Sequence, residues 1–404
     1  MDVSSGYPFW SVKNGLMHAF PKLKADIHCD VAVLGGGISG ALIADELAQH
    51  SFDVAVLEKR DIGWGCTSAS TALLQYEIDV HMVDLAKKYG EANAVLTYKA
   101  CAAAIPMLQK LAQGVRNVDF RAADSLYYAS RSRHASDLRD EYALRKRHGF
   151  DVELLERHEV QRRFKIDAPV AILSHQAARV DPYRLAYRLL MKRQKAGAGV
   201  YDRTSVERIE TDGRGVTLQT GDAYKVRAQH LVLAAGYANQ NWLKQSVARN
   251  SSSYAFATDP IDDAQLGALK NTMMWESARP YLYMRTTGDG RLMAGGEDDA
   301  VDIPAKRDAR VNAKAETLRK HVQKLLPHLP VTPVFAWAGT FAETEDGLPF
   351  FGPHEQTGSR VHFAMAYGGN GITYSMLGAG LIRALIERRS HPLERLFSFK
   401  RLER

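Results

Sequence analysis

Residues 30–58 read DVAVLGGGISGALIADELAQHSFDVAVLE, and this stretch decides the fold. The apolar run at 30–34 is typical of a buried parallel strand. Residues 41–50 place their apolar side chains on one side of a helix, and residues 52–57 form a second apolar run. The order strand, helix, strand predicts a βαβ unit of a parallel sheet.

A glycine-rich turn joins the first strand of this unit to the helix. At such a turn the N–H groups of the helix start point outward, and the helix dipole adds partial positive charge. We expect Gly35 to permit the tight turn, Gly37 to let a phosphate approach the backbone and Gly40 to let the helix pack on the strand. Ile38 and Ser39 lie between the last two glycines. The turn therefore predicts a cradle for the pyrophosphate of a dinucleotide.

Glu58 ends the second strand, about twenty residues beyond the turn. A carboxylate there can accept hydrogen bonds from adenosine ribose hydroxyls, and its charge disfavours a 2′-phosphate, so NADP is not expected. The next segment, residues 59–71, is rich in small and hydroxylated side chains. Its hydroxyls and amides could hold a second phosphate and a ribityl chain, or it could be an ordinary surface loop.

The rest of the chain alternates between helical and strand-like patterns. We expect helices over residues 82–113, 135–148, 156–164, 183–196 and 308–326, and β-rich segments over 200–235 and 250–300. The end repeats the opening theme, with a strand at 361–366, a glycine turn at 368–371 and a helix to about residue 389. Since no low-complexity linker separates these parts, two interleaved domains are expected.

Composition and charge narrow the class of protein. The chain has 404 residues, of which 46% are hydrophobic and 25% charged, and this suits a globular protein with two domain-sized cores. No apolar run is long enough to span a bilayer, and residues 1–29 lack the pattern of a secretory signal. Cys29, Cys66 and Cys101 show no disulfide or metal-ligand spacing, so a reduced, cytoplasmic compartment is expected.

The net charge of +7 has two interpretations. Basic residues cluster at 145–147, at 162–163 and in the tail 388–404, and such clusters are usually solvated surface. The other interpretation is an anionic partner such as tRNA or a membrane face. No RNA-binding or zinc-finger motif accompanies the charge, so no nucleic-acid partner is expected. The basic tail leaves a peripheral contact with the inner membrane open.

Several segments together resemble the D-amino acid oxidase (DAO) family of FAD-dependent oxidoreductases. This family includes glycine and sarcosine oxidases, D-amino acid dehydrogenase and gamma-glutamylputrescine oxidase. The matches follow the family's order from near residue 7 to residue 386. They comprise the opening at 7–10 and 21–23, the loop at 58–71, the stretch 179–206, the motif DGLP at 346–349 with Gly352, and the glycine turn at 368–373.

The resemblance implies an α/β fold with a Rossmann-like FAD-binding domain of the glutathione-reductase type. A second, α+β substrate domain on a mostly antiparallel sheet is interleaved with it. We expect residues 1–90, 150–236 and 336–404 in the FAD-binding domain, and 91–149 and 237–335 in the substrate domain. Carried over residue by residue, the resemblance implies that FAD contacts Gly35, Gly37, Ile38, Ser39, Gly40, Glu58, Lys59, Arg60, Cys66, Thr67, Ser68, Ser70, Thr71, Val206, Ala235, Gly236, Gly369, Asn370, Gly371, Ile372 and Thr373.

The implied reaction is hydride transfer from a carbon that bears an amine to N5 of the flavin, giving an imine that hydrolyses. Tyr281 and Tyr283 alternate on one strand and could cover the flavin, or pack in the core of the second domain. Glu343 and Glu345 could face a cationic amine, or be solvated. These tyrosines and Glu343, with Arg285, are the candidate catalytic residues.

The chain departs from the family where an amino-acid carboxylate is usually held. Members often carry Arg-Pro before the DGLP motif, whereas this chain has Phe341 and Ala342. An arginine fork is the natural carboxylate receptor, so the missing clamp leaves the substrate class as an amine or amino acid. Arg279 or Arg285 could replace the clamp from another wall, or be structural.

FAD is expected to be held without a covalent bond. Sarcosine-oxidase-like members attach FAD to a cysteine just before the same motif, where this chain has Gly339, and Cys66 lies in another segment. A disulfide reductase would need a second GxGxxG and a redox cysteine pair, and an aromatic hydroxylase would need a Gly-Asp motif near 295–298. Two alternatives stay open, namely a tRNA-modifying flavoprotein and an accessory subunit that needs a partner. Oxygen, a quinone or a protein carrier could be the electron acceptor.

Overall fold

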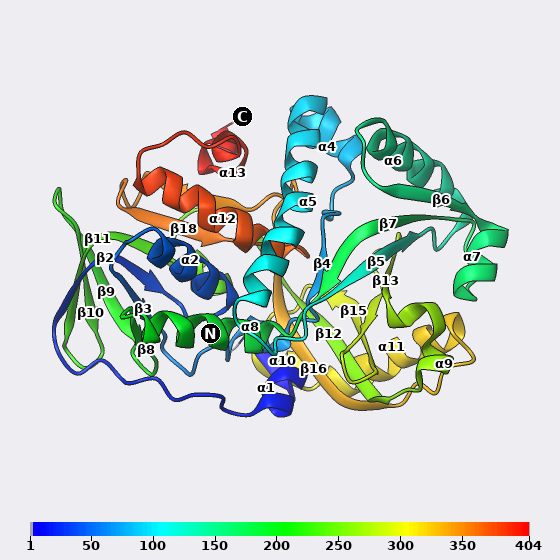
Figure 1. Cartoon of the computed structure of the whole chain (residues 1–404), viewed down its shortest axis with the longest axis horizontal. Coiled ribbons are helices and arrows are strands. Elements are labelled where there is room, and N and C mark those ends of the chain that lie inside the picture. The colour runs from blue at the N-terminus through cyan, green and yellow to red at the C-terminus, as the bar shows by residue number, and fades with distance from the viewer. Residues whose placement is uncertain (1–2, 404) are drawn as a thin grey trace.

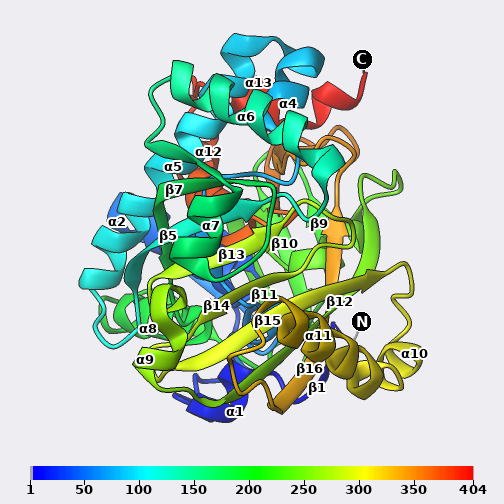
Figure 2. The same ribbon diagram turned by 90° about the vertical axis from the view of Figure 1, so that its right-hand side faces the viewer.

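Two large β-sheets organise the computed structural model, which describes residues 3–403. Figure 1 shows one sheet with α2 and α12 on one side of the molecule and the second sheet with α11 on the other. The long helix α5 (Glu91–Gln113) runs between the two halves in this view, and Figure 2 shows the second half turned toward the viewer. Among the described residues no helix is both long and apolar enough to cross a membrane.

The eight-stranded sheet contains the βαβ unit predicted from residues 30–58. β2 (Ile27–Leu34), α2 (Ile38–Gln49) and β3 (Val54–Leu57) follow one another, and β2 pairs in parallel with β3. This confirms the prediction. The remaining strands of the sheet are β8 (Gly199–Tyr201), β9 (Val206–Thr211), β10 (Val216–Thr220), β11 (Lys225–Leu233), β17 (Phe350–Pro353) and β18 (Val361–Met365).

Strand β2 is buried on both faces, which explains its continuous apolar sequence. Val31 and Val33 belong to the core that also contains the apolar side of α2. Ala32 and Leu34 point the other way and belong to the core formed with β10 and β11. The glycine turn therefore follows a strand whose last four residues are buried.

Helices α2, α8 and α12 cover this half of the molecule. α12 (Gly371–Ile386) packs on α2 and on α5, and α2 packs on α8 (Pro182–Lys195). The Asp181 carboxylate caps α8 by accepting a 2.9 Å hydrogen bond from the Arg184 N–H, with Pro182 as the first helical residue. An Asp cap followed by Pro at the first helical position is a typical helix start.

The ten-stranded sheet forms the second half. Along its order the strands are β1 (Ser4–Gly6), β16 (Pro333–Glu343), β12 (Arg249–Pro260), β15 (Arg291–Asp299), β14 (Tyr283–Thr286), β13 (Thr272–Glu276), β5 (Arg121–Tyr128), β7 (Val170–Arg179) and β4 (Leu73–Gln75), with β6 (Val152–Glu156) beside β7. β13 and β5 are parallel, and the other neighbouring pairs in this order are antiparallel. A mostly antiparallel second sheet was expected.

The expected division of the chain into two domains stays a prediction. Strands β1, β4, β6 and β7 lie in ranges expected for the FAD-binding domain, yet they pair in the ten-stranded sheet. β4 begins at Leu73, directly after the loop at 59–71. The loop expected to hold the cofactor therefore continues into the sheet of the other half.

Helix boundaries differ from the expectation at one place. The predicted helix 82–113 is two helices, because Gly90 adopts φ of +84° between α4 (Met82–Tyr89) and α5. The other predicted helices correspond to α6 (Ala135–Arg147), α7 (Arg157–Phe164), α8 and α11 (Val311–Leu325). Short helical segments are α1 (Phe9–Asn14), α3 (Cys66–Ala69), η1 (Ser132–His134), η2 (Gly236–Trp242), α9 (Asp263–Leu266), η3 (Gly267–Lys270), α10 (Pro304–Asp308), α13 (Glu394–Phe397) and η4 (Phe399–Glu403).

The basic clusters are not simply solvated surface. Arg145 is fully buried and donates a 2.8 Å hydrogen bond from Nε to Glu141. In the tail, Arg401 is buried against Asp346. The interpretation of these clusters as solvated is therefore wrong for these two arginines, which pair with buried carboxylates.

Candidate cofactor and substrate cavity

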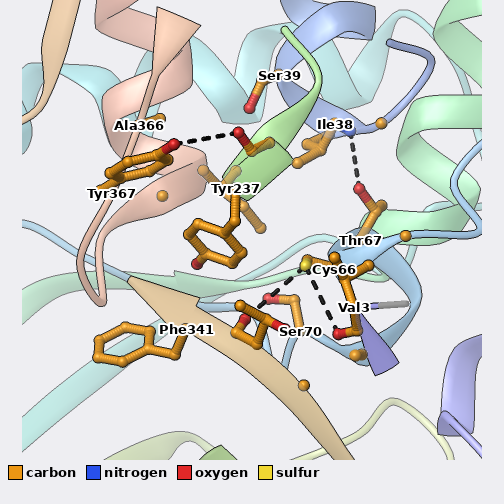
Figure 3. Close-up of a pocket in the computed structure, with 18 of the residues that line it drawn as sticks. Val3, Ile38, Ser39, Cys66, Thr67, Ser70, Tyr237, Phe341, Ala366 and Tyr367 are labelled. Carbon is orange, nitrogen blue, oxygen red and sulfur yellow. Dashed lines mark hydrogen bonds between the residues drawn. The ribbon is translucent and has the colours of Figure 1, made fainter. Parts of the chain in front are cut away.

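A cavity of about 550 Å³ lies between the two sheets. It is lined by the β2–α2 turn, the loop at 59–71, the start of α12 and residues from β12, β13, β14, β15 and β16. Figure 3 shows some of these residues around it, among them Ile38 at the start of α2, Cys66 from the loop and Phe341 from β16. A cavity of this size and mixed lining is suited to a cofactor with its substrate.

The phosphate end of the cavity is formed by the turn between β2 and α2. Gly35 has φ of +118°, and a Cβ there would lie 2.4 Å from the Ala234 carbonyl oxygen. A Cβ on Gly40 would lie 1.9 Å from the Gly35 oxygen, so this glycine allows the helix to approach the turn. The Ile38 N–H donates a 2.9 Å hydrogen bond to Thr67 Oγ1, which is drawn in Figure 3. A side chain at Gly35 or Gly40 would collide with neighbouring backbone, so this close packing of the turn requires glycine at both positions.

Glu58 is fixed at the end of β3. Its two carboxylate oxygens accept hydrogen bonds from the Gly36 N–H at 2.8 Å and from the Arg60 N–H at 2.9 Å. Arg60 lines the same region, and its buried Nε has no hydrogen-bond partner among residues 3–403. An anionic or acceptor-rich ligand would supply the missing hydrogen-bond acceptor for this guanidinium.

Three buried side chains hold successive carbonyls of the loop that faces the cavity. Trp337 Nε1 donates to the Ala69 oxygen at 2.8 Å, and Trp10 Nε1 donates to the Ser70 oxygen at 2.7 Å. Arg285 Nε donates to the Thr71 oxygen at 2.5 Å. Because these groups come from β16, α1 and β14, the loop is fixed from three elements at once.

This placement corrects the expectation for Arg285. Its guanidinium lies behind the loop rather than in the cavity wall, and it also donates to the Val180 oxygen at 2.9 Å and the Thr286 oxygen at 3.1 Å. Burial, with the neighbouring charge of Arg179, lowers the pKa of Arg285 to about 9. Arg285 positions the loop and offers nothing to a carboxylate substrate.

Cys66 lies beside the position where the family's covalent members carry their cysteine. Its Sγ is 3.8 Å from the Thr340 oxygen and 3.9 Å from the Val3 oxygen, next to Gly339 (Figure 3). Burial raises the pKa of Cys66 to about 12, despite the nearby Arg60. A protonated thiol is a poor nucleophile, and non-covalent FAD stays the expectation.

The start of α12 forms another wall. The Asp79 carboxylate accepts a 2.7 Å hydrogen bond from the Gly369 N–H. Asn370 Nδ2 and Thr373 Oγ1 donate to the Gln75 carbonyl at 2.9 Å and 3.3 Å. The N-terminus of α12 is thereby fixed to the end of β4, with its positive dipole end at the cavity.

Aromatic and acidic side chains form the remaining end of the cavity. Tyr281 and Tyr283 lie with ring centroids 5.5 Å apart, and Trp275 stacks on Tyr127 behind it at 3.8 Å. Asp298 lines the wall beside them. Burial, with the charge of Asp79, raises the pKa of Asp298 to about 6. Burial raises the pKa of Tyr283 to about 12, so its phenol stays neutral.

Three charged residues expected near the substrate lie outside the cavity wall. Glu343 is one of them, and partial burial of its carboxylate, with the charge of Asp79, raises its pKa. Glu345 is at the surface and pairs with Lys88 at 3.0 Å. Arg279 is also exposed, with its guanidinium 4.6 Å from the Tyr281 ring centroid and a 2.9 Å hydrogen bond to the Asp79 carbonyl.

The cavity brings together most of the residues predicted for the cofactor. Those in the wall are Gly35, Gly37, Ile38, Ser39, Glu58, Lys59, Arg60, Cys66, Thr67, Ser70, Thr71, Val206, Ala235, Gly236, Gly369, Gly371 and Ile372, together with the candidate catalytic Tyr281 and Tyr283. Behind the wall lie Gly40, Ser68, Asn370 and Thr373, which serve packing or hydrogen bonds that hold the wall.

Sequence reasoning missed four residues of the substrate end. These are Gln75, Asp79, Trp275 and Asp298. Gln75 and Asp79 fall in a stretch with no clear pattern, and Trp275 resembles any core aromatic. The one available signal was the acidic residue at 298, which follows two glycines and an acid at a strand end. That signal indicates a turn as readily as a site.

The residues present fit an FAD molecule. A glycine turn, the acceptor Glu58 and the partnerless Arg60 Nε suit the phosphate and adenosine part, while the helix start of α12 suits the electron-rich edge of a flavin. The two parts belong to one continuous cavity. A nicotinamide dinucleotide would not account for the loop at 66–71 lining the same space.

The sequence matches the DAO family, described as FAD dependent oxidoreductase, over residues 30–385. Glycine oxidase of Geobacillus kaustophilus (strain HTA426) is 28% identical over 380 residues, covering 89% of this chain and 93% of that protein. Gamma-glutamylputrescine oxidoreductase of Escherichia coli (strain K12) is 26% identical over 381 residues, covering 91% and 85%. The crystal structure of glycine oxidase from Geobacillus kaustophilus superposes with a TM-score of 0.75 at 23% identity, covering 92% of this chain and 98% of that one.

Proposed function

The chain belongs to the DAO family of FAD-dependent oxidoreductases, and from that premise we propose that it oxidises the C–N bond of a small amine or amino acid. The observation that supports this most is the continuity of the cavity from the phosphate turn to the chamber of Trp275, Tyr281, Tyr283 and Asp298. Relatives named for glycine and gamma-glutamylputrescine oxidation agree with an amine substrate. These comparisons do not favour the tRNA-modifying alternative.

When bound, the flavin supplies the acceptor for a hydride from the substrate carbon. The protein's part is to orient that carbon and to exclude water. Tyr281, Tyr283 and Trp275 provide a rigid apolar wall, since Trp275 Nε1 is fixed by a 3.1 Å hydrogen bond to Ser125 Oγ. The start of α12 places its positive end at the cavity, which favours negative charge there. The imine product hydrolyses in water.

The reacting amine must lose its proton before the C–H bond is broken. Tyr281 and Tyr283 have pKa values that burial raises above the ordinary range, so neither phenol is ionised at neutral pH. Asp298, with its pKa raised to about 6, is the titratable group in this wall that changes charge closest to neutrality. We therefore expect the rate to rise with pH as substrate and carboxylate deprotonate.

An anaerobic substrate panel tests this proposal. The FAD-loaded protein is mixed with primary, secondary and diamines and with D- and L-amino acids, and flavin absorbance is followed. We expect at least one amine to bleach the flavin within seconds to minutes. No bleaching with any compound, in a sample that dithionite reduces fully, would contradict C–N oxidation by the chain alone. Adding oxygen, a quinone or a protein carrier to the reduced sample then identifies the acceptor by the rate of recovery.

A further inference from the structure

The substrate end of the cavity offers hydrogen-bond acceptors and negative charge. Asp298 Oδ1 and Gln75 Oε1 are shielded from solvent, line the cavity and have no hydrogen-bond partner among residues 3–403. Buried acceptors of this kind can accept hydrogen bonds from donor groups on a bound ligand. Both acceptors therefore call for N–H or O–H groups from the substrate, and an ionised Asp298 favours a positively charged donor.

The charges around this end do not cancel. Three carboxylates, those of Asp79, Asp298 and Glu343, lie near this end, against the single guanidinium of Arg279. Besides burial, the charge of Asp79 raises the pKa of both Asp298 and Glu343, and the charge of Arg279 lowers both. Lys314, the other cation acting on Asp298, already pairs with Glu297 at 3.2 Å. The substrate end of the cavity therefore carries more negative than positive charge. A single ammonium group would neutralise only part of this excess.

The cations that could receive a carboxylate are engaged elsewhere. Arg285 is bound to backbone carbonyls behind the loop. Arg279 stands at the rim over the Tyr281 ring and donates to the Asp79 carbonyl. Phe341 occupies the wall where an arginine was expected in amino-acid-binding members. A substrate carboxylate would meet acids and aromatic faces here, which is unfavourable.

The walls also suit a cation. The faces of aromatic rings attract ammonium groups, and Trp275, Tyr281 and Tyr283 line the same cavity as the acidic residue. Asp298 is close enough to Tyr283 to add to the effect of burial in raising the pKa of its phenol. Aromatic faces and a carboxylate together distinguish a cationic amine from a zwitterion.

From these observations we propose that the substrate is a diamine-like dication without a carboxylate, and that Asp298 is the specificity-determining residue that holds its second ammonium group. This inference rests on the proposed amine oxidation, because it names the substrate class of the same cavity. The first ammonium loses its proton and is oxidised, and the second stays charged on Asp298. Ser253 lines the same cavity, and its hydroxyl partly offsets the rise that burial causes in the pKa of Asp298.

A series of three amines with equal chain length tests the charge preference. The compounds are 1,4-diaminobutane, butylamine and 4-aminobutanoate, whose far ends are positive, neutral and negative. We expect kcat/KM for anaerobic flavin reduction to fall in that order, with the diamine ahead of 4-aminobutanoate by about a hundredfold or more. Equal rates for all three compounds, or a preference for 4-aminobutanoate, would overturn the proposal.

Asp298→Asn tests the residue, and Glu297→Gln is its matched control. Both changes remove one negative charge from the end of β15, but Glu297 faces Lys314 on α11 and lies outside the cavity. We expect Asp298→Asn to lower kcat/KM for 1,4-diaminobutane by about thirtyfold, mainly through KM, and to change butylamine by less than about threefold. Glu297→Gln should leave both within about twofold. Equal losses for the diamine and butylamine in Asp298→Asn would refute the anchoring role.

An equilibrium measurement separates this inference from the proposed function. 2,5-Diamino-2,5-dimethylhexane keeps two ammonium groups that can donate hydrogen bonds, but the carbons that bear its nitrogens carry no hydrogen. It therefore cannot be oxidised by hydride transfer, and its binding to the FAD-loaded protein is followed by the shift of the flavin spectrum. We expect this compound to bind and Asp298→Asn to weaken its binding about tenfold, whereas butanedioate should cause no such spectral shift.

Binding of the dication without turnover of any amine would contradict the proposed function alone. Turnover of monoamines with no Asp298-dependent binding of the dication would contradict this inference alone. Should Asp298→Asn not retain FAD, the three-amine series on the unchanged protein decides.

Discussion

Arg285 contributes to the cavity without touching its interior. It is fully buried, has no carboxylate within the hydrogen bonds that the structure shows, and donates to the Thr71, Val180 and Thr286 carbonyls. Burial costs the charged form enough to lower the pKa of Arg285 to about 9. This arrangement indicates that the planar guanidinium of Arg285, with its fixed set of N–H donors, holds the loop at 69–71 in position.

Arg285→Lys should therefore weaken FAD binding by about tenfold, because a single ammonium cannot reach all three carbonyls. Each buried carbonyl left without a donor should cost about 1–3 kcal/mol of unfolding free energy. FAD affinity is measured by the quenching of flavin fluorescence during titration of the apoprotein. Arg179→Lys is the matched control, since Arg179 is buried nearby and bonds to the Thr286 and Lys270 carbonyls rather than to the loop. Equal losses of affinity in both variants would mean that general destabilisation, rather than loop position, is responsible.

A larger share of the residues predicted for the cofactor than of those predicted for catalysis lines the cavity, and the reason lies in what each set requires. Gly35 and Gly40 are recognisable because backbone approach excludes a Cβ, and this requirement is local. Asp298 and Gln75 come from β15 and from the end of β4, and only the sheet pairings bring them to one cavity. An isolated acid or amide carries no local signature of such a role. For the same reason the role of Arg285 could not be recognised from its position in a strand.

At the scale of elements, two helix starts converge on the cavity. α2 and α12 pack against each other, and Ser39 Oγ lies 2.7 Å from Ser375 Oγ across their first turns. The sequence predicted both strand–turn–helix units, but not their contact. Helix packing depends on side chains from both partners and from α5, which the pattern of one segment does not contain.

The pairing of β11 with β18 buries a histidine that should respond to acid. His362 is buried, and His230 Nδ1 lies 3.2 Å from its Nε2. Burial, with the influence of His230, lowers the pKa of His362 to about 3. The ordinary value near 6.5 applies to the unfolded chain, so the unfolded state binds the proton more readily. The stability contributed by the neutral imidazole is complete above pH 6.5 and is lost as the pH falls toward 3.

His362→Gln should flatten this part of the pH dependence. Between pH 7.5 and pH 5, the unchanged protein should lose about 2 kcal/mol through this residue, because the unfolded histidine gains its proton there. The variant should show a smaller fall in unfolding free energy between the same two pH values, measured by urea denaturation. His28→Gln, at an exposed position on β2, should keep the steep dependence. If the unfolding free energies of all three proteins change with pH in parallel, protonation of His362 does not destabilise the folded protein.

At the scale of the whole molecule, the cofactor loop and the substrate sheet are parts of one unit. The loop at 59–71 continues directly into β4, and β4 pairs with β7 in the ten-stranded sheet. Asn370 and Thr373 at the start of α12 hold the last residue of β4. FAD bound in the cavity would contact both halves, so loading should stabilise the whole chain rather than one lobe. The expected domain ranges stay a prediction.

The C-terminal tail provides the last prediction, because its basic residues were open to a membrane interpretation. Arg401 donates to Asp346 Oδ2 at 2.8 Å and to the Pro349 and Leu348 carbonyls at 2.7 Å, and its guanidinium lies 3.7 Å from the Phe350 ring centroid. Although burial raises it, the pKa of Asp346 is held below its ordinary value by the Arg401 charge and the Tyr89 hydroxyl. The tail is thus a clamp on the segment that leads into β17.

Arg401→Met should cost about 3–5 kcal/mol of unfolding free energy, because it leaves the buried Asp346 carboxylate without its counter-charge. Combining it with Asp346→Asn should recover part of this loss, since the unpaired charge is then gone. Lys400→Met, at the exposed neighbouring position, should stay within about 0.5 kcal/mol of the unchanged protein. Urea denaturation of the FAD-loaded proteins gives these values. A membrane-binding tail predicts the opposite pattern. Both single variants would then lose affinity for anionic vesicles and neither would lose stability, because each residue would act through its charge and not through its burial.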